Sequence, residues 1–141
     1  MLVDANLLLY AVDERSPYHE ASVDWLTSSL NGERRVALPW LSLSAFVRIS
    51  TNSRASAQPL APSEAWEFVT SWLSHDLTWI PNPTDRHAHV IGALIETYDL
   101  RASMLNVAQL TALAIERGLH LYSTDTEFAR FSEIDWVNPL Q

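Results

Sequence analysis

Two acidic residues stand where predicted strands end. Asp4 closes the apolar start of the chain, residues 1–4, and Asp125 follows an apolar stretch at residues 119–124. The carboxyl ends of parallel strands lie at one edge of a sheet, so residues far apart in sequence can meet there. Two carboxylates at that edge would suit a divalent cation such as Mg²⁺, which prefers oxygen ligands. The alternative for each acid is a helix N-cap, which accepts hydrogen bonds from backbone N–H groups.

The pattern of apolar residues predicts strands that alternate with helices. Short apolar runs predict strands at residues 1–4, 36–38, 77–80, 119–123 and 136–137. Apolar residues at helical spacing predict helices at residues 6–12, 18–31 and 106–117, a short one at 126–131, and others beginning near residues 43 and 62 and after an N-cap at Thr84. This alternation predicts an α/β fold, a three-layer α/β/α sandwich with a central parallel sheet of four or five short strands. We expect the whole chain, 1–141, to be a single domain.

For two predicted helices, the sequence indicates which faces are buried. Pro62 suits a first helical position, and the apolar residues after it form one stripe: Ala65, Phe68, Val69, Trp72 and Leu73. Residues 106–117 are apolar on almost every side, which indicates a helix buried against the sheet. Residues 52–62 are rich in Ser, Ala, Asn and Pro without periodicity, so we expect a loop there.

Several blocks of sequence carry a family resemblance. The first half contains LVDANLLLY at residues 2–10, LPW at 38–40 and FVRISTN at 46–52. The second half contains AQLTALAIE at 108–116, STDTEFARF at 123–131 and WVNPL at 136–140. In this order, from end to end, the blocks resemble PIN domain ribonucleases of the VapC type, the toxins of toxin–antitoxin pairs.

The resemblance implies an endoribonuclease that hydrolyses RNA phosphodiester bonds with Mg²⁺ or Mn²⁺ held by three or four acids. Asp4 matches the family's first acid and Asp125 the acid after the later strand, so both would be catalytic metal ligands. Glu127 would be an auxiliary catalytic acid, although an acid in a first helical turn also answers the helix dipole. Three nearby polar residues would orient these acids or bind water: Asn6, Ser123 and Thr124. The resemblance also implies a cognate antitoxin and a homodimer.

Two positions depart from the family pattern. Ala45 stands where the family often has an acid, and Val107 stands where it places an aspartate at the start of the buried helix. Valine has no oxygen, so it cannot bind the metal. Asn106 is one residue away, about 100° around a helix, and its amide would point elsewhere unless the helix start rearranges. The chain is therefore either a ribonuclease with impaired activity or a non-catalytic PIN module that retains only antitoxin or partner binding.

A further reading of Asp4 is as the nucleophile of an unrelated α/β phosphotransferase. The sequence has only three glycines and no Gly-rich loop that could cradle a phosphate, so this class is disfavoured.

Other residues that could touch RNA have plain structural alternatives. Arg48 could hold a phosphate, but an exposed ion pair is an equal alternative. Trp40 lies near the expected site and is a candidate for RNA contact, whereas Trp25 and Trp72 fall on the apolar stripes of their helices. The histidines at 87 and 89 would point about 160° apart on a helix and form no metal chelate.

Composition limits the compartment and the mode of binding. There is no cysteine among 141 residues, which excludes disulfides and thiolate metal sites and favours the cytoplasm. The residues before Asp4 are too few for a secretory signal, and the apolar run 7–12 is far shorter than the ~20 residues that span a membrane. The net charge of −8 argues against tracking phosphates along a basic face, but bound cations can reverse the charge locally, and an acidic surface suits a basic protein partner.

Overall fold

The computed structural model describes residues 1–141, which form one sheet of five parallel strands. The elements follow the order β1 (Leu2–Val3), α1 (Ala5–Val12), α2 (His19–Leu30), β2 (Val36–Ala37), α3 (Trp40–Ser50), α4 (Pro62–Leu73), β3 (Thr78–Trp79), α5 (His87–Tyr98), α6 (Met104–Arg117), β4 (Leu121–Tyr122), the 3₁₀ helix η1 (Thr126–Arg130) and β5 (Trp136–Val137). The strand order β3-β2-β1-β4-β5 places β1 at the centre. The predicted α/β fold with a parallel sheet of short strands is confirmed.

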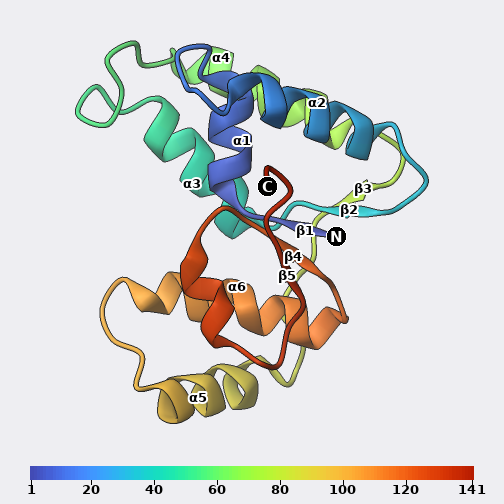
Figure 1. Ribbon diagram of the computed structural model, residues 1–141, viewed down its shortest axis with the longest axis vertical. Coiled ribbons are helices and arrows are strands. Elements are labelled where there is room, and N and C mark those ends of the chain that lie inside the picture. The colour runs from blue at the N-terminus through green and yellow to red at the C-terminus, as the bar shows by residue number, and fades with distance from the viewer.

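Helices cover both faces of the sheet because its strands are apolar on both sides. Neighbouring residues of a strand face opposite ways. Leu2 and Leu121 lie in a core cluster with α5, α6 and η1, whereas Val3 and Val36 lie in a second cluster with α1, α2, α3 and α4. Figure 1 shows these two helical layers above and below the sheet. The molecule is thus a three-layer sandwich.

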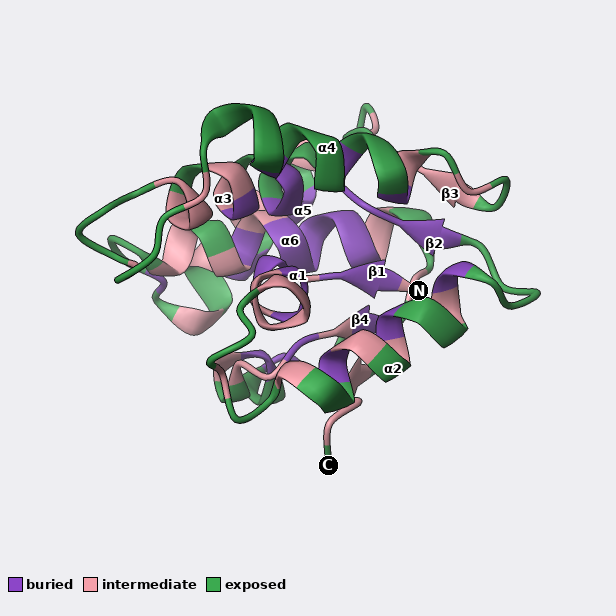
Figure 2. Cartoon of the chain, turned by 90° about the horizontal axis from the view of Figure 1, so that it is seen from above, coloured by how far each residue is buried: buried purple, intermediate pink, exposed green.

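Burial is greatest at the central strands. Both residues of β1 and of β2 are buried, whereas both residues of the edge strands β3 and β5 are only partly buried. The purple β1 and β2 and the pink β3 in Figure 2 show this gradient. The Ser42 hydroxyl donates to the backbone oxygen of Val3 (2.7 Å), which fixes α3 against the end of β1. The end of β1 is therefore a rigid position from which to present a side chain.

Most predicted elements are found, with two differences that affect the site. Thr84 is not an N-cap, because α5 begins at His87 after Arg86. The Thr84 hydroxyl donates to Glu116 instead, so a tertiary contact takes the place of the cap. The buried helix begins at Met104, two residues before the predicted start.

The loop and the stripe predicted around Pro62 are present. No helix or strand lies between Ser50 and Pro62, and α4 begins at Pro62 as expected. Ala65, Val69 and Trp72 are buried on the stripe, but Phe68 remains 37% exposed. None of the helices combines the length and apolar character that crossing a membrane requires.

Candidate functional site

Asp4 lies at the carboxyl end of β1 and begins the site. Its extended backbone (φ −80°, ψ 153°) makes it the N-cap of α1, and its Oδ1 accepts a hydrogen bond from the backbone N–H of Ala5 (2.8 Å). Its Oδ2 accepts from the Ser123 hydroxyl (2.6 Å). Burial raises the pKa of the Asp4 carboxyl and the negative charge of Asp125 adds to this, against the opposing effect of the two hydrogen bonds. A cation would relieve both causes of the raised pKa.

Ser123 joins the two strands that the site needs. Its side chain is 0% exposed at the end of β4, where its hydroxyl donates to Asp4. The same hydroxyl oxygen accepts from the Asn6 side chain (3.1 Å) and from the backbone N–H of Asp125 (3.0 Å). Residues from both ends of the chain therefore meet through one hydroxyl. The Asn6 Oδ1 atom is buried and has no hydrogen-bond partner.

Asp125 also caps a helix. Its Oδ1 accepts from the backbone N–H of Glu127 (2.9 Å) at the start of η1. Its negative charge contributes to the raised pKa of Asp4, and its backbone N–H donates to the same Ser123 hydroxyl that contacts Asp4. For both Asp4 and Asp125, the N-cap and a position suited to a metal ligand thus coexist in one residue.

Two of the predicted site residues are turned elsewhere. The Glu127 side chain is 45% exposed and forms an ion pair with Arg130 on the surface of η1. Thr124 makes no side-chain hydrogen bond, and like Asn6, Ser123 and Asp125 it does not line the cavity beside Asp4. Glu127 therefore does not add a third acid to the pair formed by Asp4 and Asp125.

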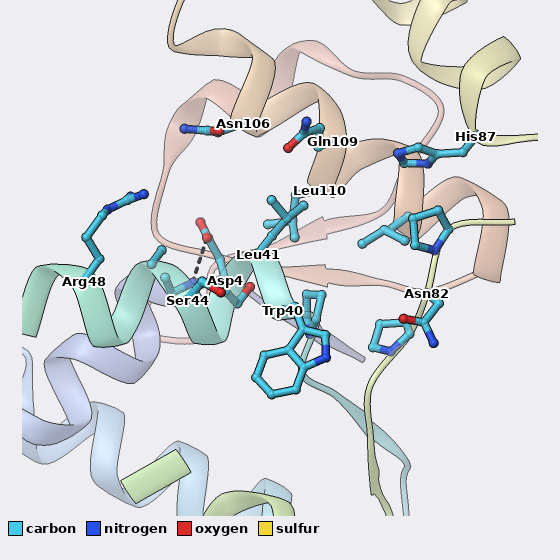
Figure 3. Close-up of a pocket in the computed structure, with 17 residues that line it drawn as sticks. Asp4, Trp40, Leu41, Ser44, Arg48, Asn82, His87, Asn106, Gln109 and Leu110 are labelled. Atoms are coloured by element: carbon cyan, nitrogen blue, oxygen red, sulfur yellow. Dashed lines mark hydrogen bonds between the residues drawn. The ribbon is translucent and has the colours of Figure 1, made fainter. Parts of the chain in front are cut away.

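A cavity of about 530 Å³ opens beside Asp4. Its walls come from the start of α1, from α3, from the segment between β3 and α5, and from α6. Asp4 is its one acidic lining residue, and Arg48 and His87 are the two that can be positively charged. Figure 3 shows Arg48 and His87 approaching from opposite sides with Asp4 between them. The cavity thus lacks the excess of acids that gives the whole chain its net charge of −8.

The exposed aromatic residue beside this cavity is Trp40. It lines the cavity, is 46% exposed, and stacks in parallel on Trp66 with ring centroids 6.4 Å apart. Arg48 lines the same cavity from the second half of α3. Both predicted RNA-contact residues therefore share the cavity with Asp4.

The face of α6 that lines the cavity differs from the expected one. Asn106, Gln109, Leu110 and Leu113 line it, at the spacing of one helical face. Val107 does not line it and packs, partly buried, against the core cluster of α5 and α6. Asn106, whose amide was expected to point elsewhere unless the helix start rearranges, lines the cavity (Figure 3).

Sequence reasoning also missed His87, Gln109 and Asn82, which line the cavity. The sequence did contain a signal for the cavity wall that follows β3. The same rule that selected the residues after the first and fourth strands applies to the third, and it points to residues 81–87. The histidines were judged only as a metal chelate, so the position of His87 after that strand was not used.

The donor set fits a magnesium ion that keeps several of its waters. No three His, Cys, Asp or Glu side chains lie together so that they could hold a metal. Mg²⁺ in proteins is often bound through one or two carboxylates, with waters and substrate phosphates as the other ligands. Asp4 and Asp125 supply two carboxylates, and the unpartnered oxygen of Asn6 could hold a bound water. The fit is to an open site and not to a closed protein cage.

Comparison with known proteins identifies the family. The PIN domain family model matches residues 1–134. The chain belongs to the PIN domain family. It is 38% identical over 138 residues to Ribonuclease VapC37 of Mycobacterium tuberculosis, covering 98% of this chain and 96% of that protein. It is 33% identical over 141 residues to Ribonuclease VapC33 of the same species, covering 100% and 99%. Within the family, the chain is therefore of the VapC type.

Solved structures agree on the fold. VapBC2 from Rickettsia felis bound to a promoter DNA fragment matches with a TM-score of 0.65 at 14% identity, over 97% of this chain and 96% of that one. FitAcB from Neisseria gonorrhoeae matches with a TM-score of 0.66 at 18% identity, over 98% and 96%. The predicted PIN-like architecture is thereby confirmed.

Proposed function

We propose that the chain is a metal-dependent endoribonuclease, the toxin of a toxin–antitoxin pair. The observation that supports this most is the Ser123 hydroxyl, which contacts the Asp4 carboxylate and the backbone of Asp125, with Asp4 lining a cavity that also contains two potentially cationic residues. Relatives that match almost the whole chain are named VapC ribonucleases. The substrate is RNA, whose phosphodiester bond would be hydrolysed beside Asp4.

In this proposal, some residues bind the metal and others bind the RNA. Asp4 and Asp125 would bind Mg²⁺ or Mn²⁺, which when bound lowers the pKa of a water and neutralises charge on the phosphate. Ser123 orients the Asp4 carboxylate with its hydroxyl and accepts a hydrogen bond from the backbone N–H of Asp125. Asn6 holds Ser123 and could position a water with its free oxygen.

On the substrate side, Arg48 would bind a phosphate of the RNA and Trp40 would stack on a base. Thr124 would bind water near Asp125. Glu127 would act as an auxiliary acid only after leaving Arg130, because its carboxylate is engaged in that ion pair.

The proposed assembly follows the relatives. The matched solved structures are titled as VapBC and Fit complexes, which supports a cognate antitoxin as partner. We propose a chain that is a single domain, forms a homodimer and acts in the cytoplasm, where its RNA substrate lies. Light scattering tests the dimer directly. A strictly monomeric protein at micromolar concentration would contradict it.

A second candidate is a non-catalytic PIN module that binds only a partner. The observation that favours it is the lack of any cluster of three His, Cys, Asp or Glu side chains, together with Val107 at the position where an aspartate is expected. With this ligand missing, the ribonuclease activity would be either impaired or lost completely.

Metal titration separates the two candidates. Single-stranded RNA is incubated with the unaltered protein over a range of Mg²⁺ and Mn²⁺ concentrations, and cleavage is followed on a gel. The ribonuclease proposal expects cleavage that rises with metal and stops in EDTA. The non-catalytic module expects none at any concentration, while binding to its antitoxin persists.

A further inference from the structure

Glu116 is a carboxylate held away from water on α6, one turn beyond the part of this helix that lines the cavity. Its side chain is 0% exposed. Its Oε1 accepts hydrogen bonds from the backbone N–H of Thr84 (3.0 Å) and from the Thr84 hydroxyl, and its Oε2 accepts from Nδ1 of His87 (2.6 Å). Burial acts to raise the pKa of Glu116, but these hydrogen bonds and the charge of His87 outweigh it and hold the pKa below its usual value.

His87 is the residue through which this buried carboxylate reaches the cavity. It is the first residue of α5, its side chain is 24% exposed, and it lines the cavity that contains Asp4. Because Nδ1 is bound to Glu116, Nε2 is the nitrogen left without a protein partner. In the charged ring both nitrogens are donors, so Nε2 can donate to an anion in the cavity. Figure 3 shows the ring pointing inward.

The segment that carries His87 is clamped at a second point. Arg117, next to Glu116, donates through Nε (3.0 Å) and a terminal nitrogen (2.7 Å) to the backbone oxygen of Asn82. Two neighbouring residues of α6 therefore hold the chain between β3 and α5 in place. A ring fixed in this way loses little conformational freedom when it binds a ligand.

We propose that His87, oriented by Glu116, binds a backbone phosphate of single-stranded RNA, on the side of Asp4 opposite to Arg48. This rests on the proposed function and adds a substrate-binding residue to it. The two potentially cationic residues flank the one acid of the cavity, so they suit the phosphates on either side of the phosphate at Asp4. A cavity of about 530 Å³ offers room for part of a single strand. Glu116 is a positioning residue that does not itself touch RNA.

The test compares three variants that share this region. His87→Ala removes the ring. Thr84→Val removes a hydrogen bond to Glu116 without touching the cavity lining, and His89→Ala removes an exposed histidine of the same helix. The dissociation constant for a fluorescent single-stranded RNA is measured by anisotropy in EDTA, and KM and kcat are measured with Mg²⁺.

We expect His87→Ala to weaken RNA binding and raise KM by about tenfold, with kcat nearly unchanged, because a hydrogen bond to a charged group is lost. His89→Ala and Thr84→Val should bind as the unaltered protein does. Unchanged binding by His87→Ala would overturn the proposal. So would equal weakening by Thr84→Val, because the cluster would then only shape the segment.

Two further measurements test the proposal even if the His87→Ala variant does not fold. If circular dichroism shows that His87→Ala is unfolded, the unaltered protein is titrated with the same RNA and its histidine ring nitrogens are followed by NMR. A shift at Nε2 of His87 but not at His89 supports the proposal, and no shift at His87 overturns it. If the unaltered protein neither binds nor cleaves RNA, the proposed function itself fails and this inference falls with it.

Discussion

Asp4 and Glu116 are two carboxylates shielded from water near one cavity, yet their pKa values move in opposite directions. Asp4 accepts two hydrogen bonds and faces the negative charge of Asp125. Glu116 accepts three hydrogen bonds and faces a histidine. Burial acts to raise both pKa values, but it outweighs the two hydrogen bonds at Asp4, whereas three hydrogen bonds and His87 outweigh it at Glu116.

This difference in pKa distinguishes a candidate functional acid, Asp4, from an acid that positions other residues, Glu116. Glu116 has its charge balanced by protein groups, so it needs nothing from solution. Asp4 remains incompletely balanced, which costs stability unless a cation arrives. Perturbed acids that face a cavity are the kind found at functional sites, whereas a saturated acid fixes structure. We therefore expect opposite results when the Asp4 carboxylate and the Glu116 carboxylate are each replaced by a neutral side chain.

The largest effect is expected from removing Asp4. Asp4→Ala should lower metal-dependent RNA cleavage by more than about a hundredfold, since even groups that only support metal ligands are worth 10 to 100-fold. Glu116→Gln should leave kcat nearly unchanged. Asp135→Asn, at a side chain that is 79% exposed, is the matched control and should cleave normally. Equal loss in Glu116→Gln and Asp4→Ala would remove the distinction between the two acids.

A smaller effect is expected from removing the Ser123 hydroxyl. Ser123→Ala leaves two donors, the Asn6 amide and the Asp125 backbone N–H, without their buried acceptor. We expect a loss of about 1–3 kcal/mol in the free energy of unfolding and a 10 to 100-fold loss in metal affinity. Urea unfolding and Mn²⁺ titration measure these two quantities. Unchanged metal affinity would mean that Ser123 only stabilises the fold.

A gain is expected from supplying the missing acid. Val107→Asp should raise magnesium-dependent cleavage at least tenfold, about 1.4 kcal/mol of barrier, if the family resemblance has the helix in register. Asn106→Asp is the companion, because Asn106 lines the cavity. Cleavage by a gel assay decides between them. A gain in Asn106→Asp alone would mean that the resemblance misplaces the ligand by one residue.

The sequence predicted the sheet and the position of two candidate site acids for the same physical reason. Short apolar runs mark strands buried on both faces, and the acids after two of them were found by their place at the carboxyl edge. Ser123 and Asn6 were assigned roles beside those acids, and their contacts with Asp4 and Asp125 agree with such roles.

The rest depended on rotation and on tertiary contacts, which periodicity does not encode. The face that α6 turns to the cavity is set by its packing against α5 and the sheet, and the predicted start of the helix was two residues late. Thr84 was predicted as a cap because its type suits one, but Glu116 competes for its hydroxyl. That competitor lies 32 residues away, and no local pattern shows it.

The smallest effect, and the most direct test of the comparison, is the pH dependence of stability. The folded pKa of Glu116 lies below its unfolded value, so its stabilisation is present above that value and is lost as pH falls through the folded pKa. The folded pKa of Asp4 lies above its unfolded value, so its stabilisation is present at low pH and is lost as pH rises through the folded pKa.

Urea unfolding of Asp4→Asn and Glu116→Gln, beside the unaltered protein, is measured from below pH 3.8 to neutral. The stability advantage of the unaltered protein over Glu116→Gln should grow with pH, by an amount on the order of 1 kcal/mol, and its advantage over Asp4→Asn should shrink. Adding Mg²⁺ at neutral pH should reverse only the second trend, because a cation supplies the balance that Asp4 lacks and Glu116 already has. The same slope for both variants would mean that the two carboxylates do not differ in this way.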